Sequence, residues 1–268
     1  MKTILIATIV LCFCRAFPQK ISSPEILHEV DILIDEYKFN QALLLMENAE
    51  DSLEVGLLQR KGFCYSKLGN YSNAIIAYEG IRKTDSLNRQ ALYHLGQLYS
   101  LSDQYDQAKI CYQNLIDLDS ANSFYYKQYA AVAVKGNDLV SGIAYYLQTV
   151  RLNHSDIEAY AELAGILLEA EQYHFVDTML TSLLGRTENA HLRLLLAKAN
   201  LGEGHYEAVI QNVEQVLIKS DTTPAHARLL GISYFQLEKY KMVIPCMDFL
   251  LSKGLKADWI YYYLGVAY

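Results

Sequence analysis

The sequence predicts an all-α protein in which helical hairpins stack on one another as an α-solenoid. Apolar residues make up 52% of the 268-residue chain, which is ample material for a core, and only 4 prolines and 14 glycines are present. So few turn-forming residues argue against an all-β chain. Apolar positions recur with helical spacing in runs of about a dozen residues. The chain also repeats itself at a fixed interval, which is typical of solenoids.

The first stretch of the chain is predicted to be a targeting signal and no part of the fold. Lys2 gives a basic start, residues 4–14 form an apolar run, and Ala16 completes the small-residue spacing that signal peptidases prefer. The run is too short to span a membrane, which takes about 20 residues. We expect a signal peptide over 1–16, ending at 19 at the latest, and a short linker over 17–22. A buried N-terminal helix is the alternative interpretation.

The repeat is seen when residues 57–88 are aligned with residues 91–122, because the two match without a gap at a shift of 34. The same shift, with one step of 33, gives a column of small residues: Gly62, Gly96, Ala130, Ala164, Ala197, Gly231 and Gly265. A second small column contains Ala42, Ala74, Ala108, Gly142, Val176, Val209 and Val243. A third column is aromatic and contains Phe39, Tyr71, Tyr105, Tyr173, Tyr206 and Tyr240, with Leu139 in its one gap.

Each repeat is predicted to be a helical hairpin. Turn residues such as "LGNY" at Leu68 and "KGND" at Lys135 separate two helical runs within a repeat. We expect the small residues where the two helices cross, because only a small side chain lets helix axes approach to about 8–10 Å. The aromatic column is expected at the start of the second helix. One hairpin cannot bury both of its faces, so stacking completes the core.

This pattern resembles the tetratricopeptide repeat family, in its secreted or periplasmic type, from about Ser23 to the last residue. The small–aromatic–small signature, seen at Gly96, Tyr105 and Ala108, recurs in seven units, although the early tryptophan of the family is absent. The resemblance implies a right-handed solenoid. Its units are expected at 23–54, 55–88, 89–122, 123–156, 157–189, 190–223 and 224–257, which together span 23–257.

The last residues, 258–268, read "DWIYYYLGVAY" and fall in register as the first helix of an eighth unit. Its second helix is missing, and solenoids normally finish with a polar capping helix. We therefore expect an uncovered apolar face here and favour a truncated chain. A natural terminus completed by another subunit is the alternative.

Tyrosine is abundant, with 22 residues, and most of it is predicted to fill space between helices. One expected core column contains Tyr65, Tyr99, Tyr234 and Tyr268, and another contains Tyr78, Tyr112 and Tyr146. The cysteines that follow the signal, Cys64, Cys111 and Cys246, are odd in number and widely spaced. We interpret them as buried free thiols.

No arrangement of residues indicates catalysis. His28 and Glu29 resemble the start of a zinc-protease helix, but Ile32 stands where the second histidine is required. The seven histidines lie in different repeats without ligand spacing and are interpreted as surface or loop residues. Gly202 and Gly204 join two helices and are interpreted as a hairpin turn. We therefore expect no enzyme, no cofactor and no metal site.

The net charge limits the partners. The chain carries 23 basic and 30 acidic residues, for a formal net charge of −7. An acidic chain repels phosphate backbones, so nucleic acid is not an expected partner.

The resemblance implies a groove, because the first helix of each unit lines the inner wall of the superhelix in this family. The exposed positions of these helices are Phe63, Ser66, Tyr93, Gln97, Phe124, Lys127, Ala131, Lys198, Arg228, Ile232 and Phe235. Aromatic anchors mixed with polar side chains suit an extended or helical peptide. Lys127 has no basic neighbours at equivalent positions, so the chaperone-tail clamp of some family members is not expected.

Two functions are compatible with these features. The first is a non-enzymatic scaffold outside the cytoplasm that binds other proteins or peptide segments, and through them a membrane-associated complex. It would be periplasmic or associated with the outer membrane in a bacterium, and secreted otherwise. The alternative is the N-terminal sensor or recognition region of a longer signalling protein or enzyme whose C-terminal part is missing.

Overall fold

The computed structural model describes residues 23–47, 54–218 and 221–268. The predicted signal peptide and linker lie outside these residues. The chain divides into two compact units at Asp138, and each is described by itself below. We call them the N-terminal unit, up to Asp138, and the C-terminal unit, Leu139–Tyr268.

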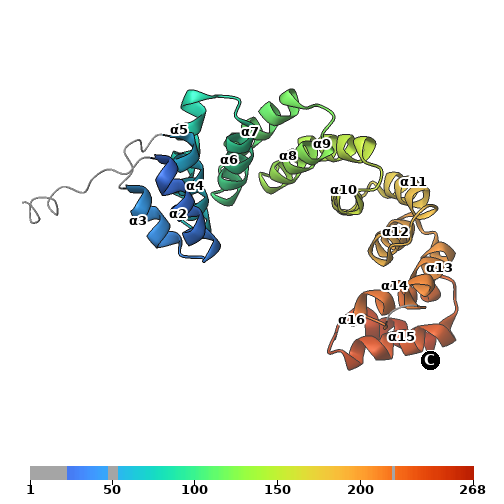
Figure 1. Cartoon of the computed structure of the whole chain (residues 1–268). Coiled ribbons are helices and arrows are strands. Elements are labelled where there is room, and N and C mark those ends of the chain that lie inside the picture. The colour runs from blue at the N-terminus through green and yellow to red at the C-terminus, as the bar shows by residue number, and fades with distance from the viewer. Residues whose placement is uncertain (1–22, 48–53, 219–220) are drawn as a thin grey trace, which may run out of the picture. The chain divides into compact units, whose positions relative to one another are not determined.

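The N-terminal unit consists of antiparallel helical hairpins that pack side by side (Figure 1). Its helices are α2 (Ser23–Asp35), α3 (Phe39–Glu47), α4 (Val55–Lys67), α5 (Tyr71–Thr84), α6 (Arg89–Leu101), α7 (Tyr105–Leu118) and α8 (Ser123–Lys135). Within hairpins α4 packs on α5 and α6 on α7, and between hairpins α5 packs on α6 and α7 on α8. Each hairpin thus covers the apolar face of the next one.

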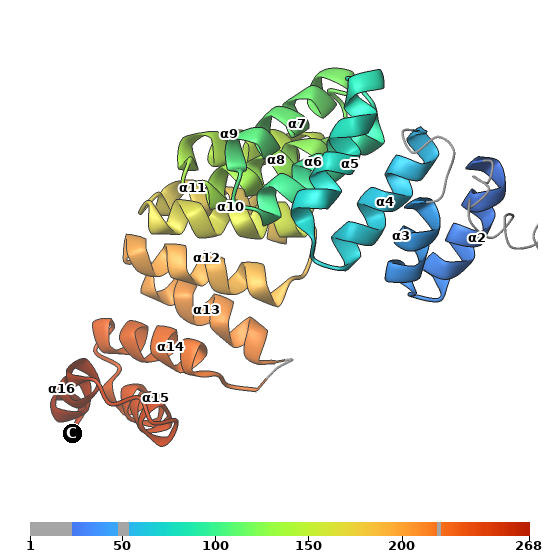
Figure 2. The same cartoon turned by 90° about the vertical axis from the view of Figure 1, so that its left-hand side faces the viewer.

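The C-terminal unit repeats this arrangement, as α12 to α15 show in Figure 2. Its helices are α9 (Leu139–Leu152), α10 (Ile157–Glu169), α11 (Tyr173–Leu184), α12 (Ala190–Glu203), α13 (Tyr206–Leu217), α14 (Pro224–Gln236), α15 (Tyr240–Ser252) and α16 (Asp258–Ala267). The described residues of both units contain helices and no strand. The predicted all-α fold of stacked hairpins is therefore confirmed.

The first helix of most hairpins begins after a capping side chain. The oxygen of Asn88 accepts a hydrogen bond from the Ala91 N–H at 3.0 Å, and the oxygen of Asn189 accepts one from the Leu192 N–H at 3.0 Å. Such a bond satisfies one of the backbone donors that the first turn of a helix leaves free. The caps form a column of their own, which contains Asn88, Asn122, Asp156, Asn189 and Thr223. They fix where each repeat starts.

The second helix begins at the aromatic column. Phe39, Tyr71, Tyr105, Leu139, Tyr173, Tyr206 and Tyr240 are each the first residue of their helix. The ring of Tyr105 packs against Gly136, where an added Cβ would lie 3.1 Å from the tyrosine Cβ. An aromatic residue at this position therefore fills the space beside the turn of a neighbouring hairpin.

The small residues of the first helices make room for large side chains of the second helices. A Cβ at Gly62 would lie 2.5 Å from the ring of Tyr78, and one at Gly96 would lie 2.7 Å from the ring of Tyr112. Both tyrosines are buried. The close neighbour is thus an aromatic ring and not the backbone that helix crossing alone would suggest.

Three sequence interpretations need correction. Tyr268 does not share the core column, because its side chain is 84% exposed. His226 is not a surface residue: it is buried, and its Nδ1 accepts a hydrogen bond from the Thr223 N–H at 3.2 Å. His94 is half-buried and stacks on Tyr78 with ring centroids 4.8 Å apart. These histidines are positioned by caps and ring packing that no spacing pattern reveals.

The cysteines of the described residues are free. Cys64 and Cys111 are buried, and Cys246 is half-buried. Burial raises the pKa of all three thiols to about 11. They are therefore protonated at neutral pH and act as small apolar side chains.

Candidate functional site

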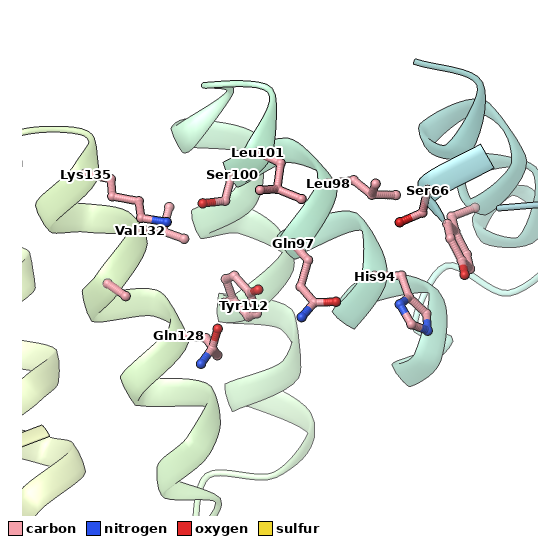
Figure 3. A pocket seen from close by; sticks show the side chains of 12 residues that line it. Ser66, His94, Gln97, Leu98, Ser100, Leu101, Tyr112, Gln128, Val132 and Lys135 are labelled. Atoms are coloured by element: carbon pink, nitrogen blue, oxygen red, sulfur yellow. The ribbon is translucent and has the colours of Figure 1, made fainter. Parts of the chain in front are cut away.

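A cavity of about 280 Å³ opens on the N-terminal unit between the first helices α4, α6 and α8 (Figure 3). Two tyrosines of the second helices, Tyr78 and Tyr112, contribute to its wall. The lining residues are Ser66, Tyr78, His94, Gln97, Leu98, Ser100, Leu101, Tyr112, Gln128, Ala131, Val132 and Lys135. This is a concave site built from consecutive repeats, which is the usual location of ligand sites in stacked helical folds.

Helical periodicity explains why these residues share the cavity. On α6, His94, Gln97, Leu98 and Leu101 follow the spacing of one helix face. The lining residues of α8 lie 34 positions further on, in the same order: Gln128, Ala131, Val132 and Lys135. Adjacent repeats therefore present the same face to the cavity, with different side chains at equivalent positions.

The lining is rich in uncharged polar groups. The Gln97 amide donates a hydrogen bond of 2.8 Å from Nε2 to the Tyr93 hydroxyl. This contact fixes the orientation of the whole amide, including the Gln97 Oε1. Burial lowers the pKa of His94, so its imidazole is neutral at pH 7 and offers one donor and one acceptor. Burial raises the pKa of Tyr78 to about 12, so its hydroxyl is neutral as well. Lys135 is the one lining residue with a formal charge at pH 7.

An aromatic group adjoins the cavity on the side of Tyr93. The ring centroids of Tyr93 and Phe124 lie 5.9 Å apart, and those of Phe124 and Tyr125 lie 6.1 Å apart. Phe124 remains 39% exposed. It can therefore bury further apolar surface on binding, while Tyr93 links it to the cavity through Gln97.

The groove residues predicted in the N-terminal unit fall into three groups. Gln97 and Ala131 line the cavity, together with Ser66. Tyr93 and Phe124 form the adjoining aromatic group, and Lys127 is half-buried on α8. Phe63 lies apart from these residues, because its ring packs on Phe39 at 6.2 Å and beneath the Lys67 ammonium at 5.2 Å.

The groove residues predicted in the C-terminal unit are either exposed or packed against another helix of that unit. Lys198 is exposed on α12. The Arg228 guanidinium lies 5.7 Å from the centre of the Trp259 ring, and Phe235 stacks on Tyr263 at 4.0 Å. Arg228 and Phe235 are thus used to hold α16 against α14.

Sequence reasoning missed four polar lining residues: His94, Ser100, Gln128 and Lys135. The repeat itself contains the signal that identifies them. Ser100 lies 34 positions after Ser66, and Gln128 lies 34 positions after His94. Extending each predicted groove position by one repeat and by one helical turn would have included them.

The arrangement can bind but does not suggest chemistry. Neutral amide, hydroxyl and imidazole groups above an apolar floor can pair with the N–H and C=O groups of an extended peptide. Within the described ranges, no cluster of three or more His, Cys, Asp or Glu side chains could hold a metal ion. In the same ranges, no helix is long and apolar enough to cross a membrane.

Comparison with known families found the tetratricopeptide repeat. The family model matches residues 55–80 and 90–122, which cover hairpins α4–α5 and α6–α7. These are the two hairpins that build most of the cavity. Comparison with curated protein sequences found no match.

Solved structures show the same fold over a larger part of the chain. A tetratricopeptide repeat protein from Parabacteroides merdae is 15% identical, with a TM-score of 0.57, and the match covers 91% of this chain and 98% of that one. YrrB, described as a tetratricopeptide repeat protein with an unusual peptide-binding site, is 15% identical with a TM-score of 0.55, over 71% and 96% of the two chains. PilF of Pseudomonas aeruginosa is 14% identical with a TM-score of 0.54, over 76% and 95%. The chain therefore has the fold of tetratricopeptide repeat proteins.

Proposed function

We propose that this chain is a non-enzymatic interaction scaffold whose N-terminal unit binds an extended segment of a partner protein in the cavity between α4, α6 and α8. One observation carries the proposal. Equivalent residues of consecutive repeats line a single concave site in which neutral polar groups alternate with apolar ones. A peptide offers the same alternation along its backbone and side chains.

Rigidity supports binding at this site. Tyr78 and Tyr112 are both buried and held against Gly62 and Gly96, so the wall of the cavity is fixed by the core of the repeats. A preformed wall costs little conformational entropy when a partner binds. The peptide-binding site of YrrB, a protein of the same fold, adds support by analogy.

The charge of the lining indicates which peptides are preferred. No carboxylate lines the cavity and Lys135 is its one formal charge. A segment with an acidic side chain near Lys135 gains a favourable pairing, whereas a basic segment meets an ammonium group. We infer a preference for uncharged or acidic segments.

We also propose that the scaffold works outside the cytoplasm. The support is the apolar run of residues 4–14 after Lys2, with Ala16 at a cleavage spacing. Fusion of residues 1–22 to a reporter enzyme that is active only after export tests this. Export of the fusion, and loss of export when Ile6 and Val10 are replaced by Arg, is the expected result. A reporter that stays in the cytoplasm would refute the location and leave the binding proposal intact.

Peptide display tests the binding site. A random library of peptides of about 12 residues is selected on the full chain and on the Gln97→Ala/Gln128→Ala double variant. We expect the enriched peptides to bind the variant at least about tenfold more weakly, since two amides of the lining are lost. The matched control is Gln41→Ala/Gln107→Ala, because both glutamines are exposed on second helices. Equal binding to wild type and to the Gln97/Gln128 variant would refute the site.

A further inference from the structure

The C-terminal unit has a larger cleft that is made mainly by second helices. It has a volume of about 710 Å³ and lies between α9, the start of α10, and α11 with the residues that follow it. The lining residues are Leu147, Val150, His154, Ser155, Ile157, Tyr160, Phe175, Thr178, Met179, Ser182, Leu183, Arg186 and Thr187. None of the predicted groove residues lies in it.

One continuous stripe of α11 forms a wall of this cleft. Phe175, Met179 and Leu183 are spaced by four residues and make the apolar part of the stripe. Phe175 is 47% exposed and Met179 is half-buried, whereas Leu183 is buried, so the stripe is open to solvent mainly at Phe175 and Met179. From Phe175 to Arg186 the wall rises about 16 Å, which is roughly three helical turns.

The opposite wall is also apolar. Leu147 and Val150 of α9 and Ile157 of α10 face the cleft. The hydroxyl and imidazole groups among the lining residues come mainly from exposed positions, namely His154, Ser155, Thr178 and Ser182. The cleft is therefore an apolar channel with polar edges.

The charge of the cleft is opposite to that of the chain. Arg186 is the one lining residue with a formal charge at pH 7, and no carboxylate lines the cleft. Among the described residues, no ion pair is formed by Arg186, whereas the whole chain has a net charge of −7. Arg186 is exposed next to the apolar stripe, so it is available to an anionic group of a partner.

From this cleft we propose a second interaction surface, which binds an amphipathic helix of a partner protein that is about three turns long and places a carboxylate against Arg186. The apolar floor decides between a helix and an extended segment. A helix satisfies its own backbone hydrogen bonds, whereas an extended segment would bury N–H and C=O groups against Phe175, Met179 and Leu183 without partners. Apolar side chains on one face of the helix would fill the channel, as in other helix-in-groove complexes.

This proposal is independent of the N-terminal site. It concerns other helices, another unit and another conformation of the bound segment. Its failure would leave the peptide proposal for the α4–α6–α8 cavity unchanged, and the reverse is also true.

The test uses a labelled synthetic peptide and fluorescence anisotropy on the full chain at low salt. The acidic probe is a helix-stabilised peptide of about 14 residues with leucines on one face and glutamates at one end. The basic probe has lysines in place of the glutamates. We expect saturable binding of the acidic probe and at least about fivefold weaker binding of the basic one, because only the first can pair with Arg186.

Variants make the test specific. Arg186→Glu should invert the preference so that the basic probe binds more tightly, and Phe175→Ala should weaken both probes by about tenfold through lost apolar contact. Lys241→Glu is the matched control, since it makes the same charge change at an exposed position of α15 outside the cleft. It should leave both probes unchanged.

Three results would overturn the proposal. The first is that neither probe binds saturably. The second is that the acidic probe binds wild type and Arg186→Glu equally well. The third is that Phe175→Ala weakens the binding of neither probe. A further measurement uses dodecanoate as a small amphiphile. Binding of dodecanoate in the cleft without binding of the acidic probe would refute a helix as the occupant. Circular dichroism of each variant confirms that the helices are retained.

Discussion

The Tyr99 hydroxyl on α6 donates a hydrogen bond of 2.9 Å to Oε1 of Glu79 on α5, and so joins the first helix of one hairpin to the second helix of the hairpin before it. The same relationship recurs in the C-terminal unit, where the Tyr234 hydroxyl on α14 donates to Glu214 on α13 at 3.2 Å. In both cases the residues are 20 positions apart. This tyrosine–carboxylate pair therefore occurs at the same place in two repeats, where it ties neighbouring hairpins together.

Removal of the hydroxyl should loosen this junction. We expect Tyr99→Phe to lower the free energy of unfolding by about 1–2 kcal/mol, because the carboxylate of Glu79 loses a donor and is only partly open to water. The free energy of unfolding is measured by urea unfolding, monitored by circular dichroism. Tyr268→Phe is the matched control: Tyr268 is 84% exposed, so the change should stay within about 0.3 kcal/mol. Equal effects of the two substitutions would mean that the pair contributes nothing to stability.

Alkaline pH should weaken both junctions. Burial, together with the hydrogen bond to Glu79, raises the pKa of Tyr99 to about 12, and burial beside Glu214 raises the pKa of Tyr234 to about 12. An unfolded tyrosine has a pKa of about 10. The folded state thus favours the neutral phenol, and its contribution is complete below about pH 10 and is lost as pH rises through about 12.

The measurement is the urea midpoint between pH 9 and pH 12, with tyrosinate absorbance recorded in parallel. We expect the midpoint to fall across this range by less in Tyr99→Phe/Tyr234→Phe than in the wild type. The double variant removes two of the phenols whose ionisation is suppressed by folding. Identical pH profiles for the two proteins would contradict the linkage.

The fold was predictable from the sequence because one interval repeats along the chain. The small and aromatic columns alone place the helix crossings and the starts of the second helices. The cap column that begins at Asn88 follows the same interval. The pairing of Tyr99 with Glu79 was not predictable, because it depends on how far α5 and α6 are rotated against each other, which periodicity does not determine.

The candidate sites were predictable only in part. Gln97 and Ala131 were identified since the first helices carry a regular pattern. The cleft beside α11 was missed because its apolar residues, such as Phe175 and Met179, look like ordinary core positions in the sequence. Only the packing of α9 and α11 shows that they remain uncovered. Tertiary spacing between second helices leaves no local sequence signal.

The glycine column makes a further prediction. A Cβ at Gly96 would lie 2.7 Å from the ring of Tyr112, which is 1% exposed and packed in the core. We expect Gly96→Ala to cost about 1–3 kcal/mol of stability through overpacking, and Gly96→Leu to cost at least as much. Urea unfolding measures both.

Two further variants separate overpacking from other effects. Gly165→Ala is the control, because a Cβ there meets nothing within 4 Å, and the better helix propensity of alanine should stabilise by about 0.5–1 kcal/mol. Tyr112→Leu should relieve part of the cost of Gly96→Ala in a double-mutant cycle. Additive effects of the two substitutions would show that the ring is not the obstacle.

Backbone conformation at the hairpin turns gives the last prediction. The residue at the turn adopts a left-handed conformation in both units, with φ of 72° at Gly69 and 57° at Glu238. This conformation costs a non-glycine residue about 1–2 kcal/mol. Glycine adopts it freely, but glycine loses somewhat more conformational entropy on folding, and this loss is smaller than the cost it avoids. We expect Glu238→Gly to raise the free energy of unfolding by about 0.5–1 kcal/mol.

The reverse substitution completes the test. Gly69→Ala should destabilise by about 1 kcal/mol although a Cβ there meets nothing within 4 Å, so that the loss reflects the backbone alone. Both variants are measured by urea unfolding, with Glu162→Gly as the comparison for a glycine introduced at an exposed position inside helix α10. That substitution should destabilise, because an exposed helical glycine costs about 1 kcal/mol relative to alanine. A loss of stability in Glu238→Gly as large as in Glu162→Gly would mean that the turn does not require the left-handed conformation.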